Sequence, residues 1–244
     1  MTFLRVLTIA CLLAAPVSAA WEDNQCVRCH QTEKLPISLG HSFDEWRASS
    51  HARAGVGCEK CHGGDASLTG EAKAHHDVKP ASAPESKVHT SHLMTTCGAC
   101  HVKERQAYEQ TVHARQVADS KGGATCSTCH GSMATSFPSP ADLRSRCAVC
   151  HSKPVQAQAA LSVWAAAKIQ LYRTRRAIET VEAKDAEWYA GALKRFHEME
   201  ETYVDISLQW HRFATKSVLQ RSRDLLRLAK LLDEEAGLRK KMAK

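Results

Sequence analysis

The sequence predicts a mainly α-helical protein in which a loop-rich region of short helices, with few strands, precedes a bundle of long amphipathic helices. The bundle is predicted because proline is absent after Pro154 and glycine then occurs only at Gly191 and Gly237. The loop-rich region is predicted because the residues before the bundle carry regularly spaced cysteines but few Leu, Ile, Val and Phe side chains. So little apolar surface cannot form a conventional core. The two regions therefore need different sources of stability.

The first 20 residues have the pattern of a secretory signal peptide. Arg5 provides the positive start, residues 6–15 form a short apolar run, and Val17-Ser18-Ala19 resembles a cleavage site. The run is too short for a confident membrane anchor, so no stable membrane span is expected after cleavage. We therefore expect export to the periplasm. Cys11 would be removed with the peptide, which leaves ten of the eleven cysteines.

The ten remaining cysteines all belong to one repeated motif, Cys-x-x-Cys-His. It occurs at Cys26–Cys29–His30, Cys58–Cys61–His62, Cys97–Cys100–His101, Cys126–Cys129–His130 and Cys147–Cys150–His151. This is the attachment signature of c-type haem. The two thiols form thioethers to the haem vinyl groups, and the adjacent His is the proximal ligand of the iron. Zinc sites, redox cysteine pairs and disulfide scaffolds do not need a His at that position. The sequence therefore predicts five covalently attached haem c groups.

The formal net charge of +7 does not indicate a nucleic-acid partner. Five haems would add about ten propionate groups, which brings the mature protein close to neutrality. The basic residues are also not interleaved with aromatic side chains that could stack on bases. We therefore expect no nucleic-acid binding.

The predicted domains are a signal peptide at 1–20, a five-haem cytochrome domain at 21–154 and an α-helical domain at 155–244. In the last domain the helix is expected to be interrupted near Ala183-Lys184-Asp185, with Asp185 as the N-cap of the next helix. Apolar residues recur at helical spacing on both sides of that break. They are Leu161, Trp164, Ile169, Tyr172, Ile178, Trp188, Phe196, Met199, Tyr203, Ile206, Leu225, Leu228 and Leu232. Two or three long helices that pack together are expected.

One unit of the haem region occurs twice. The first copy runs from Phe43 through His51-Ala52-Arg53 to the second motif, and the second runs from Tyr108 through His113-Ala114-Arg115 to the fourth motif. In both copies an aromatic residue precedes His-Ala-Arg, and Cys-x-x-Cys-His-Gly follows. The spacing of 62–68 residues is too irregular for a solenoid and favours a duplicated two-haem module.

From Phe43 to His151 the chain resembles the small multihaem cytochromes of anaerobic respiration. It is also similar to the haem cores of the hydroxylamine oxidoreductase and cytochrome c nitrite reductase superfamily. That resemblance implies that a His in an aromatic-x-x-Ser/Thr-x-His unit ligates a haem from the distal side, and that the C-terminal helices can supply a further His. Cytochrome c nitrite reductases often carry Lys in place of one motif His, whereas all five motifs here keep His. This difference argues against a nitrite or hydroxylamine enzyme.

Each iron needs a distal ligand, and nine histidines lie outside the motifs. His51 and His113 are the strongest candidates because the repeat carries both. His75 or His76 is expected to serve as a ligand downstream of the second motif. The further candidates are His92, His89, His41 and His211, with His197 as a weaker one. His197 and His211 are two heptads apart and share a helix face.

The fourth motif lacks a nearby histidine, because none occurs between Gly131 and Cys147. Met133 is the only thioether in that stretch, and it would raise the potential of the iron that it bound. A histidine of the helical region, His211 ahead of His197, would instead complete the site and explain why that region follows directly. With neither ligand, the iron would be open.

Three functions are compatible with these features. The first is a periplasmic carrier that transfers electrons in a respiratory chain, between a quinol-oxidising membrane protein and a terminal reductase. The second is an oxidoreductase whose one open haem acts on a small nitrogen or sulfur compound. The third is a docking subunit that forms a homo-oligomer or a larger redox complex through the C-terminal helices. The sequence favours the carrier, because it shows no constellation of catalytic acids and bases.

Overall fold

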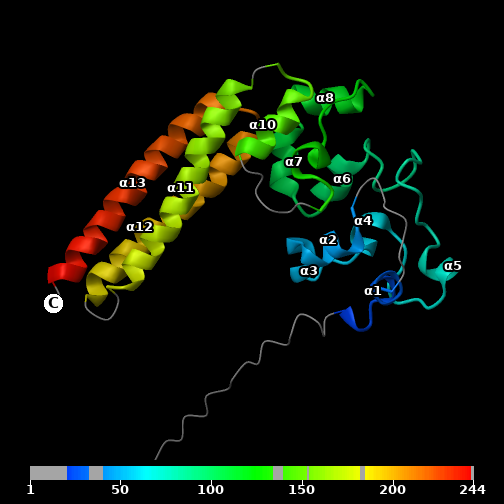
Figure 1. The fold of residues 1–244 in the computed structure, drawn as a ribbon, viewed down its shortest axis with the longest axis horizontal. Helices are drawn as coiled ribbons and strands as arrows, with labels where there is room; N and C mark the ends of the chain where they lie inside the picture. The colour runs from blue at the N-terminus through cyan, green and yellow to red at the C-terminus, as the bar shows by residue number, and fades with distance from the viewer. Residues whose placement is uncertain (1–20, 33–40, 134–139, 153, 182–184, 243–244) are drawn as a thin grey trace, which may run out of the picture. The chain divides into compact units, whose positions relative to one another are not determined.

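The computed structural model describes residues 21–32, 41–133, 140–152, 154–181 and 185–242. Every regular element in these residues is an α-helix, which confirms the predicted fold class (Figure 1). The predicted signal peptide lies outside the described residues.

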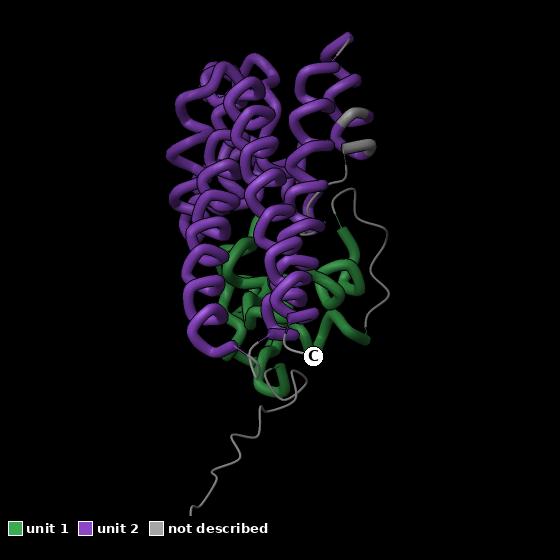
Figure 2. Tube along the Cα trace, turned by 90° about the vertical axis from the view of Figure 1, so that its left-hand side faces the viewer, with its two compact units in different colours: residues 1–79 green, residues 80–244 purple. Residues whose placement is uncertain are grey.

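The chain forms two compact units, residues 1–79 and 80–244 (Figure 2). Unit 1 contains α1 (Gln25–His30), α2 (Phe43–Ala48), α3 (Ser50–Arg53), α4 (Glu59–His62) and α5 (Glu71–Ala74). Unit 2 contains α6 (Leu93–Gly98), α7 (Val102–Tyr108), α8 (Val112–Ala118), α9 (Cys126–His130), α10 (Pro140–Ala148), α11 (Val155–Glu179), α12 (Ala186–His211) and α13 (Thr215–Met242). The predicted boundary between residues 154 and 155 falls inside unit 2 and stays a prediction.

Several of the short helices begin at side-chain caps, and the motif helices α4 and α9 end at glycines. Ser42 opens α2 with a capping box, in which its hydroxyl accepts from the Glu45 N–H and the Glu45 carboxylate accepts from the Ser42 N–H. After the motif helices α4 and α9, Gly63 and Gly131 adopt φ values of 84° and 68°. These angles lie in a region that glycine enters without steric cost. Local signals, rather than long amphipathic stripes, therefore define these helices.

The last three helices form an antiparallel bundle. They span 25, 26 and 28 residues and lie side by side in the structure (Figure 1). α11 packs most extensively against α13. The predicted cap is confirmed, because the Asp185 carboxylate accepts a hydrogen bond of 3.0 Å from the Trp188 N–H.

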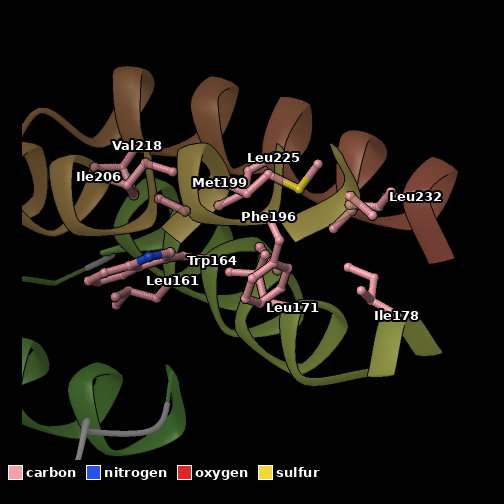
Figure 3. Close-up of a cluster of buried hydrophobic side chains, with 14 of the residues drawn as sticks. Leu161, Trp164, Leu171, Ile178, Phe196, Met199, Ile206, Val218, Leu225 and Leu232 are labelled. Carbon is pink, nitrogen blue, oxygen red and sulfur yellow. The ribbon is translucent and has the colours of Figure 1, made fainter. Parts of the chain in front are cut away.

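The bundle core is built from the predicted apolar stripe (Figure 3). Most of the predicted residues are buried there, including Leu161, Trp164, Ile178, Phe196, Met199, Ile206, Leu225 and Leu232. Three predicted packing residues instead lie on the outer surface: Ile169, Tyr172 and Leu228 are 56%, 66% and 43% exposed. The three-helix arrangement buries a narrower face than the spacing of apolar residues suggested.

Within unit 2 the bundle packs directly against two short helices, α7, which follows the third haem motif, and α10, which contains the first Cys of the fifth motif. α12 contacts α7, and α11 contacts α10. Leu143 of α10 belongs to the buried core cluster, and Cys129 of the fourth motif packs against that cluster. The helical region is therefore a packing partner of the later motifs and is not a detached tail.

Candidate haem sites

All five motifs fold as a single helical turn. In the second, third and fifth motifs, the N–H of the motif His donates to the carbonyl of the first motif Cys, at 2.9, 3.0 and 2.8 Å. The first and fourth motifs lie inside α1 and α9. One turn of helix brings residues three and four apart to the same side. Both thiols and the imidazole of each motif are thus presented together, as haem attachment requires.

In unit 1, two motif histidines face histidines from outside the motifs. The ring centroids of His30 and His75 are 5.9 Å apart, and the rings are inclined at 70°. The centroids of His62 and His41 are also 5.9 Å apart, at 60°. Of the neighbouring candidates His75 and His76, His75 is therefore the one that approaches a motif imidazole.

In unit 2, two further pairs bring together residues that are far apart in the sequence. The ring of His151 faces His113 of α8 at 5.9 Å and 63°. The ring of His130 faces His211, the last residue of α12, at 6.1 Å and only 11°. The fourth motif, which lacks a nearby histidine in the sequence, is thus approached by the helical region.

These separations match the space that an iron ion needs. Imidazole ligands bind metals at about 2 Å, so two nitrogens on opposite sides of one ion place their ring centroids roughly 6 Å apart. His89 and His92 are also 6.2 Å apart, but both belong to one tight turn, in which the His92 N–H donates to the His89 carbonyl. Distance alone is therefore not decisive. The four other pairs each join one motif His to one His from elsewhere in the chain.

For two of these imidazoles, burial favours the neutral form that binds iron. Burial lowers the pKa of His62 and of His113, with neighbouring histidines as the next cause. A neutral imidazole has a free nitrogen lone pair for a metal. Nδ1 of His211 lies 2.8 Å from the carbonyl of Ser207. A hydrogen bond there fixes the tautomer and leaves Nε2 available, as is usual for metal-binding histidines.

The remaining candidates are in other surroundings. His76 makes a long ion-pair contact of 3.7 Å with Asp77, and His197 pairs with Glu200 at 2.9 Å on the exposed side of α12. His92 is exposed, and its Nδ1 lies 2.9 Å from the Ser86 carbonyl. Met133 is half-buried after α9, but the side chain that faces His130 is the imidazole of His211. This geometry favours His211 over Met133 as the distal group at the fourth motif.

The two copies of the repeat fold alike around their histidines. Ser49 and Thr111 are N-caps with extended backbone, and their hydroxyls accept from the N–H of Ala52 and Ala114 at 3.2 and 3.1 Å. His51 and His113 follow two residues after the caps, and the Nδ1 atom of each is buried. The Ser/Thr of the aromatic-x-x-Ser/Thr-x-His unit is therefore a helix cap that orients the histidine.

A second shared contact ties the helix before each ligand helix to the next haem motif. The Trp46 indole donates to the Val56 carbonyl at 3.1 Å, and the Tyr108 hydroxyl donates to the Ala124 carbonyl. Both acceptors lie two residues before the first Cys of a motif. We call these two contacts the aromatic staples. The Trp46 N–H and the Tyr108 O–H are paired in these contacts, while the two rings provide apolar surface.

A third contact is also repeated. The guanidinium of Arg53 donates to the Ala48 carbonyl at 2.6 Å, and that of Arg115 donates to the Gln110 carbonyl at 3.5 Å. Each Arg thus reaches back five residues and closes the turn before the ligand helix. The structure explains why the His-Ala-Arg sequence recurs.

The thiols show which motifs are neighbours within each unit. The thiols of Cys97 and Cys126 are in hydrogen-bond contact, which lowers the pKa of Cys126 to about 7. Burial, and then the charge of Cys147, raise the pKa of Cys129 to about 11. In unit 1, burial and then the nearby Cys26 raise the pKa of Cys58 to about 12. The third, fourth and fifth motifs are therefore adjacent in that order, and the first lies beside the second.

These features fit haem c. Thiol pairs and motif imidazoles share one turn, and the imidazoles of His30, His62, His130 and His151 each face a second imidazole at the separation an iron requires. Several of these groups are also open to their surroundings: Cys29, Cys100 and Cys150 are exposed. Among the described residues, no three metal-ligand side chains converge on one point.

Sequence reasoning missed the residues that support the ligands. The repeat contained the aromatic residues and the caps, but nothing in the pattern showed that Trp46 and Tyr108 bond the backbone before the next motif. Phe213, which packs on His113, gave no signal at all. It lies between two helices and belongs to neither apolar stripe.

The comparisons with known proteins agree with this chemistry. The family described as "Cytochrome c554 and c-prime" matches residues 13–63. The polyheme cytochrome OmcC of Geobacter sulfurreducens is 32% identical over 79 residues, which is 32% of this chain and 9% of OmcC. OmcB of the same species is 33% identical over 112 residues, or 44% of this chain and 14% of OmcB. These matches support a multihaem c-type cytochrome.

A further relative extends the similarity. The multiheme cytochrome MtrA of Shewanella baltica is 27% identical over 141 residues, which is 56% of this chain and 34% of MtrA. The chain thus spans between 9% and 34% of the length of these curated relatives. No solved structure matches the chain at a significant level.

Proposed function

We propose that this chain is an exported pentahaem c-type cytochrome that transfers electrons between redox partners in a respiratory chain. One observation carries the proposal: motif imidazoles are paired with second imidazoles, which leaves no open position on the irons they would hold. An iron with two histidine ligands exchanges electrons without binding a substrate. This favours a carrier over an enzyme.

The residues have distinct roles in this proposal. The ten motif cysteines hold the haems, and His30, His62, His101, His130 and His151 are the proximal ligands. His75, His41, His211 and His113 are the distal ligands opposite His30, His62, His130 and His151, and His51 is a further distal ligand by its equivalence to His113. Each haem iron supplies one-electron chemistry at a low potential, since histidine ligands do not raise the potential as methionine does.

The order of the attachment thiols supports conduction within each unit. Because Cys97 contacts Cys126 and Cys129 lies near Cys147, groups attached at the third, fourth and fifth motifs would be neighbours. The fourth haem would then be the middle member of its unit. His211, from the helical bundle, would ligate this middle haem.

Location and partners follow from the same proposal. The N-terminal signal pattern and the c-type attachment chemistry favour the periplasm. A long helix apolar enough to cross a membrane does not occur in the described part of the chain. We propose a quinol-oxidising membrane protein or a terminal reductase as partner, with the C-terminal helices available for assembly into an oligomer or a larger complex.

The test combines mass spectrometry with low-temperature EPR of the ferric protein. The mature chain should gain the mass of five haems and lack its first 19 or 20 residues. All irons should be low-spin. One low-spin signal should differ in g anisotropy, which depends on the angle between the imidazole planes: 11° at His130–His211 against 60–70° in the other pairs.

Single variants then assign the signals. His211→Ala should convert one haem to high-spin and remove the near-parallel signal, whereas Met133→Leu should change neither. A high-spin iron in the unmodified protein would contradict the carrier function and support the oxidoreductase alternative. Fewer than five haem masses would contradict the count.

A further inference from the structure

The connection between α12 and α13 contains an unusual backbone conformation. Phe213 has a φ of 56°, in the left-handed region that bulky residues rarely occupy. Such a conformation costs free energy and persists only where its surroundings enforce it. Glycine would be the ordinary residue at such a position. A phenylalanine here indicates that its side chain has a task that glycine could not perform.

The surrounding contacts fix this conformation. The Phe213 N–H donates to the Trp210 carbonyl at 2.7 Å, and the Phe213 carbonyl accepts from the Thr215 N–H at 2.9 Å. The rings of Trp210 and Phe213 are 6.0 Å apart. These hydrogen bonds hold the backbone of the turn, and the backbone fixes the direction of the Phe213 Cα–Cβ bond.

The ring of Phe213 packs against the imidazole of His113. The ring centroids are 4.7 Å apart and the planes are inclined at 84°, an edge-to-face arrangement. In the described part of the chain, the buried Nδ1 of His113 has no hydrogen-bond partner. Metal-binding histidines are usually oriented by a hydrogen bond at that nitrogen. The packing against Phe213 takes the place of that bond.

His211, the last residue of α12, provides the contrast. Its Nδ1 lies at hydrogen-bond distance, 2.8 Å, from the Ser207 carbonyl, so its own helix orients it. His113 has Phe213 instead. The last residue of α12, His211, thus supplies one imidazole that faces a motif histidine, and Phe213, two residues later, packs against another, His113.

We infer that Phe213 is a positioning residue that holds His113 in register with His151, so that the end of α12 and the connection after it act on the distal ligands at both the fourth and the fifth motif. This inference rests on the proposed function only in taking His113 as a ligand. Loss of the ring would let the imidazole turn about its side-chain bonds and would weaken its hold on the iron.

The test uses the full holoprotein with Phe213→Gly and Phe213→Tyr. Glycine removes the ring and suits the positive φ, so the backbone is not strained further. Tyrosine keeps the ring. The readouts are the EPR signal of the fifth haem, its reduction potential, and the rate at which carbon monoxide binds the reduced protein, because carbon monoxide enters only where the distal ligand dissociates.

In Phe213→Gly we expect one low-spin EPR signal to change its g anisotropy. We also expect one haem to bind carbon monoxide faster, by up to about tenfold. A tenfold change in rate corresponds to the free energy that one aromatic pair contributes. Phe213→Tyr should behave like the unmodified protein. The haem mass and the far-UV circular dichroism should stay unchanged in both variants. Identical EPR signals and carbon monoxide rates in Phe213→Gly would overturn the inference.

A third variant, His113→Ala, tests whether His113 is a ligand separately from whether Phe213 positions it. If it converts one haem to high-spin while Phe213→Gly changes nothing, the ligand assignment stands and the role of Phe213 is wrong. If His113→Ala leaves every haem low-spin, the ligand assignment itself is wrong, and with it this inference.

Discussion

The motif-bearing residues before Pro154 and the helical bundle after it are stabilised in different ways. In the described part of the motif region only six apolar side chains are buried, and half of them are alanines: Val27, Trp46, Ala52, Ala107, Ala114 and Leu143. The shorter bundle buries sixteen, among them Trp164, Leu161 and Phe196. The bundle has a core made of its own side chains, whereas the described part of the motif region has none, and we expect the haems to supply it.

The first way to test this comparison is to remove the haems. Ordering a chain costs about 1–2 kcal/mol per residue in backbone entropy, which six buried side chains cannot offset over the motif region. We expect the full chain, expressed without haem-attachment machinery, to lose all stable structure before residue 152 while the bundle keeps helical structure. Hydrogen exchange should show protected amides only within residues 155–242. Protected amides in α1–α8 of the apo protein would contradict this prediction.

The fold of the bundle could be predicted because its information is local. Three signals define where its helices run: the absence of proline, an N-cap at Asp185, and apolar residues at helical spacing. Each of these signals is local in the sequence. The exposed Ile169, Tyr172 and Leu228 could not be identified in this way. The width of the buried face depends on how three helices meet, and this is a long-range property.

The second prediction concerns the bundle core. Leu225 is 1% exposed, whereas Leu231 of the same helix is 52% exposed. Leu225→Ala should lower the free energy of unfolding of the bundle by about 2–5 kcal/mol, since it leaves a cavity. Leu231→Ala should change it by less than about 0.5 kcal/mol. Thermal unfolding followed at 222 nm would measure both, and equal effects of the two variants would refute the assigned core.

The third prediction tests the aromatic staple in the motif region. The Tyr108 hydroxyl donates to the Ala124 carbonyl, and burial raises the pKa of Tyr108 to about 12, so the hydroxyl keeps its proton. Tyr108→Phe keeps the ring and removes the bond. It should destabilise the holoprotein by about 1–2 kcal/mol, because the carbonyl before the fourth motif loses its partner.

The control for this variant is Tyr172→Phe, since Tyr172 is 66% exposed on α11. It should leave stability unchanged. If the two Tyr→Phe variants have the same melting temperature, the staple does not stabilise the motif region. That result would indicate that the haems supply almost all of the stability of the motif region.

The candidate sites could be predicted in part. The motif cysteines and proximal histidines follow from a five-residue pattern that needs no tertiary information. Distal ligands depend on which helices meet, so the sequence could only rank them. The pairing of His211 with His130 joins residues 81 positions apart. The sequence favours His211 there because that ligand would explain why a helical region follows the last motif directly.

The smallest expected effect comes from His197, which shares a helix face with His211 but not its surroundings. Fourteen residues of α-helix span about 21 Å, so the two imidazoles cannot both reach the haem of the fourth motif. His197 pairs with Glu200 in an exposed i,i+3 contact, and such a pair contributes less than about 1 kcal/mol. We therefore expect His197→Ala to leave every haem low-spin and the melting temperature nearly unchanged. A high-spin haem in His197→Ala would show that the bundle supplies its ligand from the middle of α12 and would reverse the assignment of His211.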